Sequence, residues 1–358
     1  MVFLSLGGAS LGRKPHFANA GKRGRLAAAT PRHAMIDLKL SLTCADYPRV
    51  QLLASGAAKP KGIDLRMVLG RHGSWGDRAE MLRRAVQDPD IQGGEYSMAQ
   101  YLYRIDKGDR SLVGLPVFPL RNFVARDLYV VAGGPVRTAA DLAGARIGMY
   151  AWGASGSVWY RHFLRFIGVD PAGVKWTIGN PDAGWGSAAA PVLPAGVARA
   201  GERSLSDMLL AGELDAIYAP PRPKLYHPVD GPIGRLFPDF RPVEQAYFKA
   251  TGAFPPQHLI VLQRAAWEAN KWIAPALTQA CIEAEDAFAA AQRGFPYSTP
   301  WEEAELEATR LLMGDGFHAQ GLEANRAQID MFCAEAHQLG LTSRRVAVEE
   351  YFADYLAS

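Results

Sequence analysis

Two side chains in this sequence have types and positions suited to handling a proton and an organic acid. His258 ends the segment TGAFPPQH directly before the apolar run LIVL, and imidazole ordinarily titrates near neutrality. Arg121 follows the segment GLPVFPL, and a guanidinium group binds a carboxylate through two parallel hydrogen bonds. We take His258 as the candidate acid and Arg121 as a candidate carboxylate ligand. The structural alternatives are a histidine that caps a strand and an arginine in a surface ion pair.

A second group of candidates surrounds the expected start of a helix. Ser155, Gly156 and Ser157 separate a predicted strand from a predicted helix, so their backbone N–H groups could receive a carboxylate. The same residues would also suit a simple helix cap. Arg161 lies one turn into that helix, on the face of Ser157. These four residues are candidate anion ligands.

Further candidates lie in loops. Arg126 and Arg222 could bind the same anion or serve the structure alone. Glu95 and Ser97 follow Gly93-Gly94 at a predicted strand end, where Glu95 could act as an acid if buried. Solvent-facing turn residues are the alternative.

No linear spacing of His, Cys, Asp or Glu is typical of a metal site, although a divalent metal is not excluded. A divalent metal would require distant residues to converge in space. The set we considered is Glu95, Asp215, His227 and His258.

The order of predicted elements indicates an α/β protein with parallel sheets. Apolar and polar residues alternate over 36–43, and a helix over 47–54, a strand over 63–69 and a helix over 77–86 follow. A second series begins after Gly133-Gly134-Pro135. Alternating strands and helices of this kind form parallel sheets covered by helices, with ligands at the strand ends.

The breaks in this pattern predict two lobes joined by a two-segment hinge near Val131 and Pro220, followed by a C-terminal helical region. Consecutive prolines at 220–221 interrupt regular structure because they remove backbone donors. The predicted divisions are a disordered extension over 1–34, lobe 1 over 35–131 plus 220–264, lobe 2 over 132–219, and helices over 265–358 that pack on lobe 1.

Composition excludes several classes of function. Of the 358 residues, 49% are hydrophobic and 21% charged, which is ordinary for a folded globular protein. No basic stripe with interleaved aromatic residues favours nucleic acid, and no apolar run reaches the ~18 residues of a membrane span. The three cysteines are far apart, as in proteins of reducing compartments. Because the basic residues of the first 34 follow the apolar run Val2–Leu6, which is not the order of a signal peptide, we expect a cytoplasmic protein.

Several segments, in conserved order along the chain, resemble the 4,5-dihydroxyphthalate decarboxylase family. They are LSLTCADYPRV, PKGIDL, GGEYSMAQYL, GLPVFPLRNF, DLAGARIGMY, SVWYRHFL, LSDMLLAGELDAIY, RLFPDF, TGAFPPQH, LLMGDGF and GLEANR. The resemblance spans about 36–343. It implies the fold of type II periplasmic solute-binding proteins, with one small-molecule site in the cleft between lobes. The sequence departs from the family pattern at Glu95-Tyr96, in the stretch 124–127 and in the loop 182–200. A relative that acts on a different substrate is therefore the alternative.

The resemblance implies an enzyme of aromatic catabolism and phthalate degradation, a lyase that decarboxylates 4,5-dihydroxyphthalate or a related hydroxylated aromatic acid without a cofactor. An acid must protonate the ring carbon, cations must hold the spectator carboxylate, and an acceptor must take the phenol proton, a role open to Glu95 and Ser97. The alternative is a non-catalytic solute-binding protein that closes on an organic anion for a transporter, or an intracellular sensor. The partner expected is an aromatic carboxylate, with no nucleic acid and no membrane; homo-oligomer formation is left open.

Overall fold

The computed structural model describes residues 37–70, 75–184, 193–220, 222–294 and 299–358. The predicted extension over 1–34 lies outside these residues. Within the described ranges, no helix is both long and apolar enough to span a bilayer.

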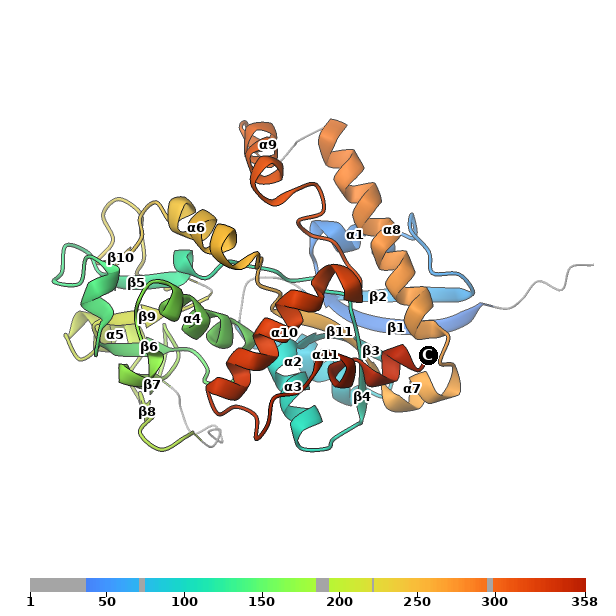
Figure 1. The fold of residues 1–358 in the computed structure, drawn as a ribbon, viewed down its shortest axis with the longest axis horizontal. Helices are drawn as coiled ribbons and strands as arrows, with labels where there is room; N and C mark the ends of the chain where they lie inside the picture. Colours follow the sequence, from blue (N-terminus) through green and yellow to red (C-terminus); the bar gives the residue numbers. More distant parts are fainter. Residues whose placement is uncertain (1–36, 71–74, 185–192, 221, 295–298) are drawn as a thin grey trace, which may run out of the picture. The chain divides into compact units, whose positions relative to one another are not determined.

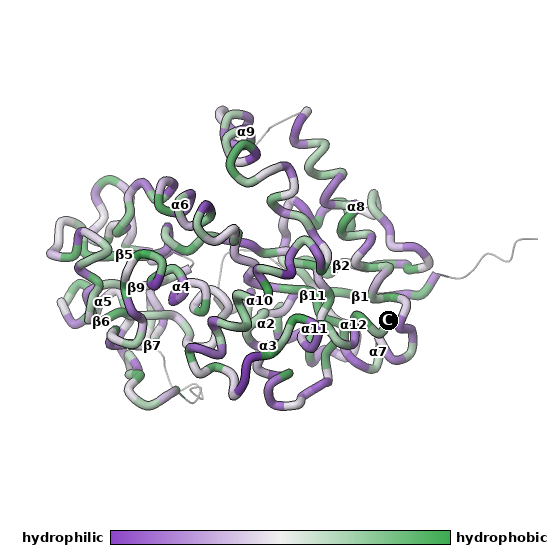
Figure 2. The backbone as a smooth tube through the Cα atoms, viewed as in Figure 1, coloured by the Kyte–Doolittle hydropathy of each residue, from purple (hydrophilic) through white to green (hydrophobic). Residues whose placement is uncertain are grey.

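A five-stranded sheet organises the first lobe (Figure 1). In spatial order its strands are β2 (Ile63–Gly70), β1 (Leu38–Ala45), β3 (Gly93–Ser97), β11 (His258–Gln263) and β4 (Leu112–Leu115). β1 runs parallel to β2 and β3, whereas β11 runs antiparallel to β3 and β4. The apolar run of β11 is buried on an interior strand, between β3 and β4, and its hydrophobic character is visible in Figure 2. The helices of this lobe are α1 (Gln51–Ala54), α2 (Trp75–Gln87), α3 (Met98–Asp106) and α7 (Arg264–Ala269).

A six-stranded sheet organises the second lobe. Its strands, in spatial order, are β10 (Ile233–Arg235), β5 (Leu128–Val131), β9 (Ala216–Tyr218), β6 (Arg146–Met149), β7 (Lys175–Ile178) and β8 (Ala198–Arg199). The helices of this lobe are α4 (Ser155–Phe166), α5 (Leu205–Leu210) and α6 (Arg241–Thr251). In each sheet one antiparallel strand that follows a crossing between lobes, β11 or β5, is inserted beside the parallel strands. The predicted two-lobed α/β class is therefore confirmed.

The crossings between lobes lie elsewhere than predicted. Val131 pairs with Ile233 inside the second sheet, so residues 128–131 and the segment 220–235 belong to lobe 2. The chain crosses before β5 and again between α6 and β11. The two crossings contact each other through a bridge between Arg121 and Pro256, and the Gln257 N–H donates to the Leu120 carbonyl at 2.9 Å. The predicted hinge at Val131 and Pro220 is wrong because its turn residues connect elements within lobe 2.

The C-terminal helices contact both lobes rather than lobe 1 alone. They are α8 (Ile273–Gly294), α9 (Glu302–Met313), α10 (Leu322–Gln338), α11 (Val348–Tyr351) and α12 (Ala353–Leu356). α8 packs on α1, and α12 packs on β4. On α10, however, Ile329, Phe332, Cys333 and Ala336 form one buried stripe at helical spacing, and α10 packs on α4. The Phe332 ring lies 5.5 Å from that of Trp159 on α4, so the tail ties the lobes together.

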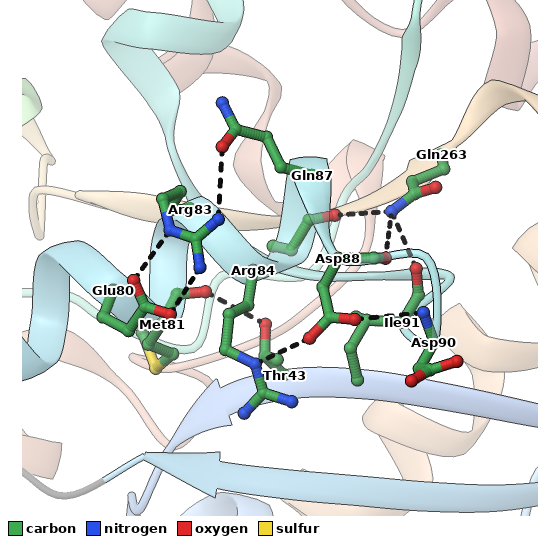
Figure 3. A network of polar contacts seen from close by, with 11 residues as sticks. Thr43, Glu80, Met81, Arg83, Arg84, Gln87, Asp88, Asp90, Ile91 and Gln263 are labelled. Atoms are coloured by element: carbon green, nitrogen blue, oxygen red, sulfur yellow. Dashed lines mark hydrogen bonds and ion pairs between the residues drawn. The ribbon is translucent and has the colours of Figure 1, made fainter.

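Side-chain hydrogen bonds fix α2 against the first sheet (Figure 3). The Gln263 amide, at the end of β11, donates to three carbonyls at or just after the C-terminus of the helix, those of Ala85, Asp88 and Ile91. The Thr43 hydroxyl of β1 donates to the Met81 carbonyl at 3.4 Å. These bonds set the direction of the whole helix and thereby the place of its first turn.

Candidate active site

A cavity of about 800 Å³ lies between the two lobes, at the ends of the strands. Both lobes, both crossings and the segment after α10 contribute to its wall. The predicted residues that line it are His258, Ser97, Ser155 and Gly156. Its apolar wall includes Leu82, Leu102, Leu120 and Trp152, which suits an aromatic ring.

His258 and Glu95 form a buried pair at the first-lobe side of the cavity. They lie on adjacent antiparallel strands, where His258 is in register with Ser97. The His258 Nδ1 is 2.5 Å from Glu95 Oε1, and Glu95 is completely buried while His258 is 9% exposed. His258 lines the cavity, whereas Glu95 lies behind it.

The surroundings of Glu95 keep its carboxylate ionised. Burial by itself would raise the pKa of Glu95, but the hydrogen bond and charge of His258 outweigh it, helped by the Ala45 N–H at 2.8 Å and the Tyr47 hydroxyl at 2.7 Å. The resulting pKa is about 2. Because an ionised carboxylate only accepts hydrogen bonds, Nδ1 of His258 carries a proton, and Nε2 is the nitrogen left for the cavity. Glu95 is therefore placed to position His258, and the role of Glu95 as an acid stays a prediction.

The N-termini of α3 and α4 meet at the floor of the cavity. Ser97 caps α3, and its hydroxyl oxygen lies 2.9 Å from that of Ser155 in the first turn of α4. The Ala99 N–H of α3 donates to the Ser155 hydroxyl at 3.1 Å. The two lobes are thus joined here by hydrogen bonds, at a place where two helix dipoles favour negative charge.

The second-lobe wall converges on Gly156. A Cβ atom built there would lie 2.8 Å from Gln257 Oε1 and 2.9 Å from the hydroxyl oxygens of Tyr150 and Tyr218. Only glycine lets these three polar groups approach the helix so closely. The Tyr218 ring is held by stacking on Tyr160, with centroids 4.2 Å apart.

Arg78 is the single arginine or lysine among the described residues of the cavity wall, and sequence reasoning missed it. It lies in the first turn of α2, where a cation is disfavoured by the helix dipole. No hydrogen bond or ion pair joins Arg78 to another described residue. A positively charged residue in the first turn of a predicted helix is unfavourably placed, and this signal in the sequence could have identified Arg78. The sequence predicts a crevice lined by several positive charges. Among the described residues, the positive groups at the cavity wall are instead Arg78 and the helix N-termini.

Arg121 does not bind a ligand in this cavity. It is 5% exposed and lies outside the wall. Its guanidinium donates to the carbonyls of Phe254 and Ala319, both at 3.2 Å, and to the side chain of Asn325 on α10. Burial lowers its pKa to about 9. Arg121 instead fastens the first crossing to the second and to the C-terminal helices.

The other predicted ligands also lie outside the cavity wall. Ser157 donates to the Ala151 carbonyl at 2.6 Å, and Arg161 donates to the carbonyls of Trp152 at 2.6 Å and Ser157 at 2.9 Å. These bonds hold the loop before α4 in place from outside the cavity wall. Arg126 donates to Asn122 at 2.8 Å, and Arg222 is exposed beside Tyr226.

The four residues considered for a metal do not converge. Asp215 pairs with Arg146 at 2.6 Å in lobe 2, and His227 pairs with its neighbour Asp230. Across the described parts of the chain, no group of three His, Cys, Asp or Glu side chains is arranged to hold a metal ion.

Comparison with known proteins supports the resemblance drawn from the segments. A protein named 4,5-dihydroxyphthalate decarboxylase from Comamonas testosteroni is 29% identical over 327 residues, which cover 89% of this chain and 97% of that protein. This chain is a homologue of proteins of that name. A 4,5-dihydroxyphthalate decarboxylase from Pseudomonas putida is also 29% identical, over 221 residues that cover 60% of this chain and 83% of the relative. No protein-family model matches the chain.

Among solved structures, the chain is similar to the alkanesulfonate-binding protein SsuA from Xanthomonas axonopodis pv. citri bound to MOPS. The TM-score is 0.47 at 13% identity, and the match covers 87% of this chain and 97% of SsuA.

Proposed function

We propose that this protein is a decarboxylase of 4,5-dihydroxyphthalate or a related hydroxylated aromatic acid. The observation that carries the proposal is the pair of His258 and Glu95, which presents one imidazole nitrogen to a cavity with a partly apolar wall. The names of the homologues supply the substrate class. Cofactor independence and a cytoplasmic location stay predictions.

In this proposal His258 supplies the proton that replaces the departing carboxylate. The protonated Nε2 gives its proton to the ring carbon that bears the carboxylate. The bond to the carboxylate then breaks, carbon dioxide leaves, and the bonding electrons restore the aromatic ring. Glu95 stabilises the imidazolium before transfer and holds the ring in position. His258 then regains a proton from solvent.

Arg78 and the N-terminus of α4 would bind the carboxylates. Arg78 offers a charged donor with two N–H groups, and the N-terminus of α4 offers backbone N–H groups. The first N–H groups of α3 already donate to Gln257, Ser155 and Ser97. The Ser97–Ser155 contact would hold the two lobes together beneath the substrate, at the floor of the cavity.

The test is an assay of the purified full chain with 4,5-dihydroxyphthalate, following carbon dioxide and 3,4-dihydroxybenzoate together. The proposal predicts equal amounts of both products over many turnovers. Binding of the compound without release of gas would instead support the solute-binding alternative, as would recovery of the protein from a periplasmic fraction.

A further inference from the structure

Asp127 is an acidic side chain in the wall of the cavity with no role in the chemistry above. It ends the first crossing, directly before β5, and is 7% exposed. Its carbonyl accepts the Ala219 N–H at 3.0 Å, and its own N–H donates to the Val124 carbonyl at 3.1 Å. The second sheet therefore fixes the place from which this carboxyl group faces the cavity.

The carboxylate of Asp127 is incompletely neutralised by its neighbours. The Arg126 Nε lies 3.6 Å from Oδ2, which is longer than a hydrogen bond. Burial raises the pKa of Asp127, and the charges of Arg126 and Arg235 offset this only in part. A buried carboxylate that its neighbours compensate only in part is stabilised when a ligand brings it a hydrogen-bond donor.

The charges of the cavity wall come from different elements, Arg78 from α2 of lobe 1 and Asp127 from the residue directly before β5 of lobe 2. Burial raises the pKa of Tyr150 to about 12; the positive charge of Arg78 acts against this rise, and the negative charge of Asp127 adds to it. Asp127 acts on the neighbouring Tyr218 in the same sense. The wall near Arg78 thus suits carboxylates, and the wall near Asp127 would repel them and suit hydroxyl donors.

We infer that Asp127 binds the ring hydroxyl groups of the substrate, so that the site selects aromatic acids with a hydroxyl para to the departing carboxylate. This inference rests on the proposed function and deepens it. It gives to Asp127 the acceptor role that the sequence suggested for Glu95 and Ser97.

The proposed step uses His258 as the proton donor and Asp127 as a temporary proton acceptor. As His258 protonates the ring carbon, the para hydroxyl gives its proton to Asp127, and the ring becomes a neutral dienone. When carbon dioxide leaves, the bonding pair restores the aromatic ring, and the para oxygen takes its proton back from Asp127. The net change is one proton from His258 for one carbon dioxide.

Binding of the proposed product, 3,4-dihydroxybenzoate, and of benzoate tests this role by calorimetry with the full chain. The wild type should bind the dihydroxylated acid about tenfold or more tightly, because each hydrogen bond to a charged acceptor contributes roughly 1.5–3 kcal/mol. Asp127→Asn should reduce this preference to about threefold or less without weakening benzoate. Asp239→Asn, which removes an exposed charge next to α6, should keep the full preference.

A further comparison uses the wild type alone, so the inference can be tested even if Asp127→Asn fails to fold. The wild type should bind 3,4-dimethoxybenzoate, which lacks both donors, no more tightly than benzoate. Equal binding of all three acids by the wild type, no binding of any, or an undiminished preference in Asp127→Asn would overturn the inference. Hydroxyl preference without gas release would overturn the decarboxylase proposal alone, and gas release without the preference would overturn the role of Asp127 alone.

Discussion

At the scale of residues, the site depends on a charge that is buried and yet kept ionised. Glu95 accepts hydrogen bonds from strand β1, from Tyr47 and from His258, which compensate the cost of removing a carboxylate from water. The same bonds leave His258 a single free nitrogen, directed by the strand pairing toward the cavity. The histidine is thereby fixed in tautomer and orientation before any substrate arrives.

Replacing Glu95 by glutamine should lower kcat by about tenfold or more with little change in KM, because the amide cannot stabilise the imidazolium. Steady-state kinetics of the two proteins check this. A variant with wild-type kcat would show that the carboxylate does not act through His258.

The same variant should also change how stability depends on pH. The folded-state pKa of Glu95 is about 2, below its ordinary value of 4.5, so its ionisation stabilises the fold above pH 4.5 and this contribution is lost as the pH falls toward 2. Urea unfolding should therefore show the wild type more stable than Glu95→Gln at pH 7, with a difference that narrows toward pH 3. A gap of constant size would contradict the lowered pKa.

Arg78→Gln tests the carboxylate ligand. Loss of a charged hydrogen bond costs roughly 1.5–3 kcal/mol, so KM should rise about tenfold to a hundredfold while the melting temperature stays unchanged. Arg222→Gln, an exposed arginine outside the cavity wall, is the matched control and should keep the wild-type KM. An unchanged KM in Arg78→Gln would remove this residue from the site.

At the scale of elements, the two crossings behave as one packed unit. Arg121 joins them because it lies on the first crossing and donates to Phe254 on the second, and it also reaches Asn325 on α10. Among the described hydrogen bonds, Arg121 is the one donor to the Phe254 carbonyl and to the Asn325 side-chain oxygen, so removing its guanidinium would leave both oxygens without a donor.

We expect Arg121→Met to lower the free energy of unfolding by about 2–4 kcal/mol, since breaking a buried polar network costs this much. KM of the folded enzyme should stay near the wild-type value because Arg121 lies outside the cavity wall. Denaturant unfolding and steady-state kinetics measure the two effects. A large rise in KM with unchanged stability would restore Arg121 as a ligand.

At the scale of the whole molecule, the sequence predicts what depends on neighbours along the chain. His258 and Ser155 could be assigned to the cavity because each lies where a strand or helix begins. The lobe boundary could not be predicted from the sequence, because residues 128–131 join the second sheet through pairing with β10, which lies far along the chain. The place of Arg78 likewise depends on how α2 packs against β1 and β11, and the role of Arg121 on where α10 docks.

The central claim is that both lobes together enclose a decarboxylation site in which His258 donates the proton. The most direct measurement is carbon dioxide release from 4,5-dihydroxyphthalate by the wild type and by His258→Ala, with substrate binding measured on the same samples. We predict that His258→Ala loses about a hundredfold or more in kcat and retains substrate binding within a few fold. Release of carbon dioxide at the wild-type rate by His258→Ala would contradict it.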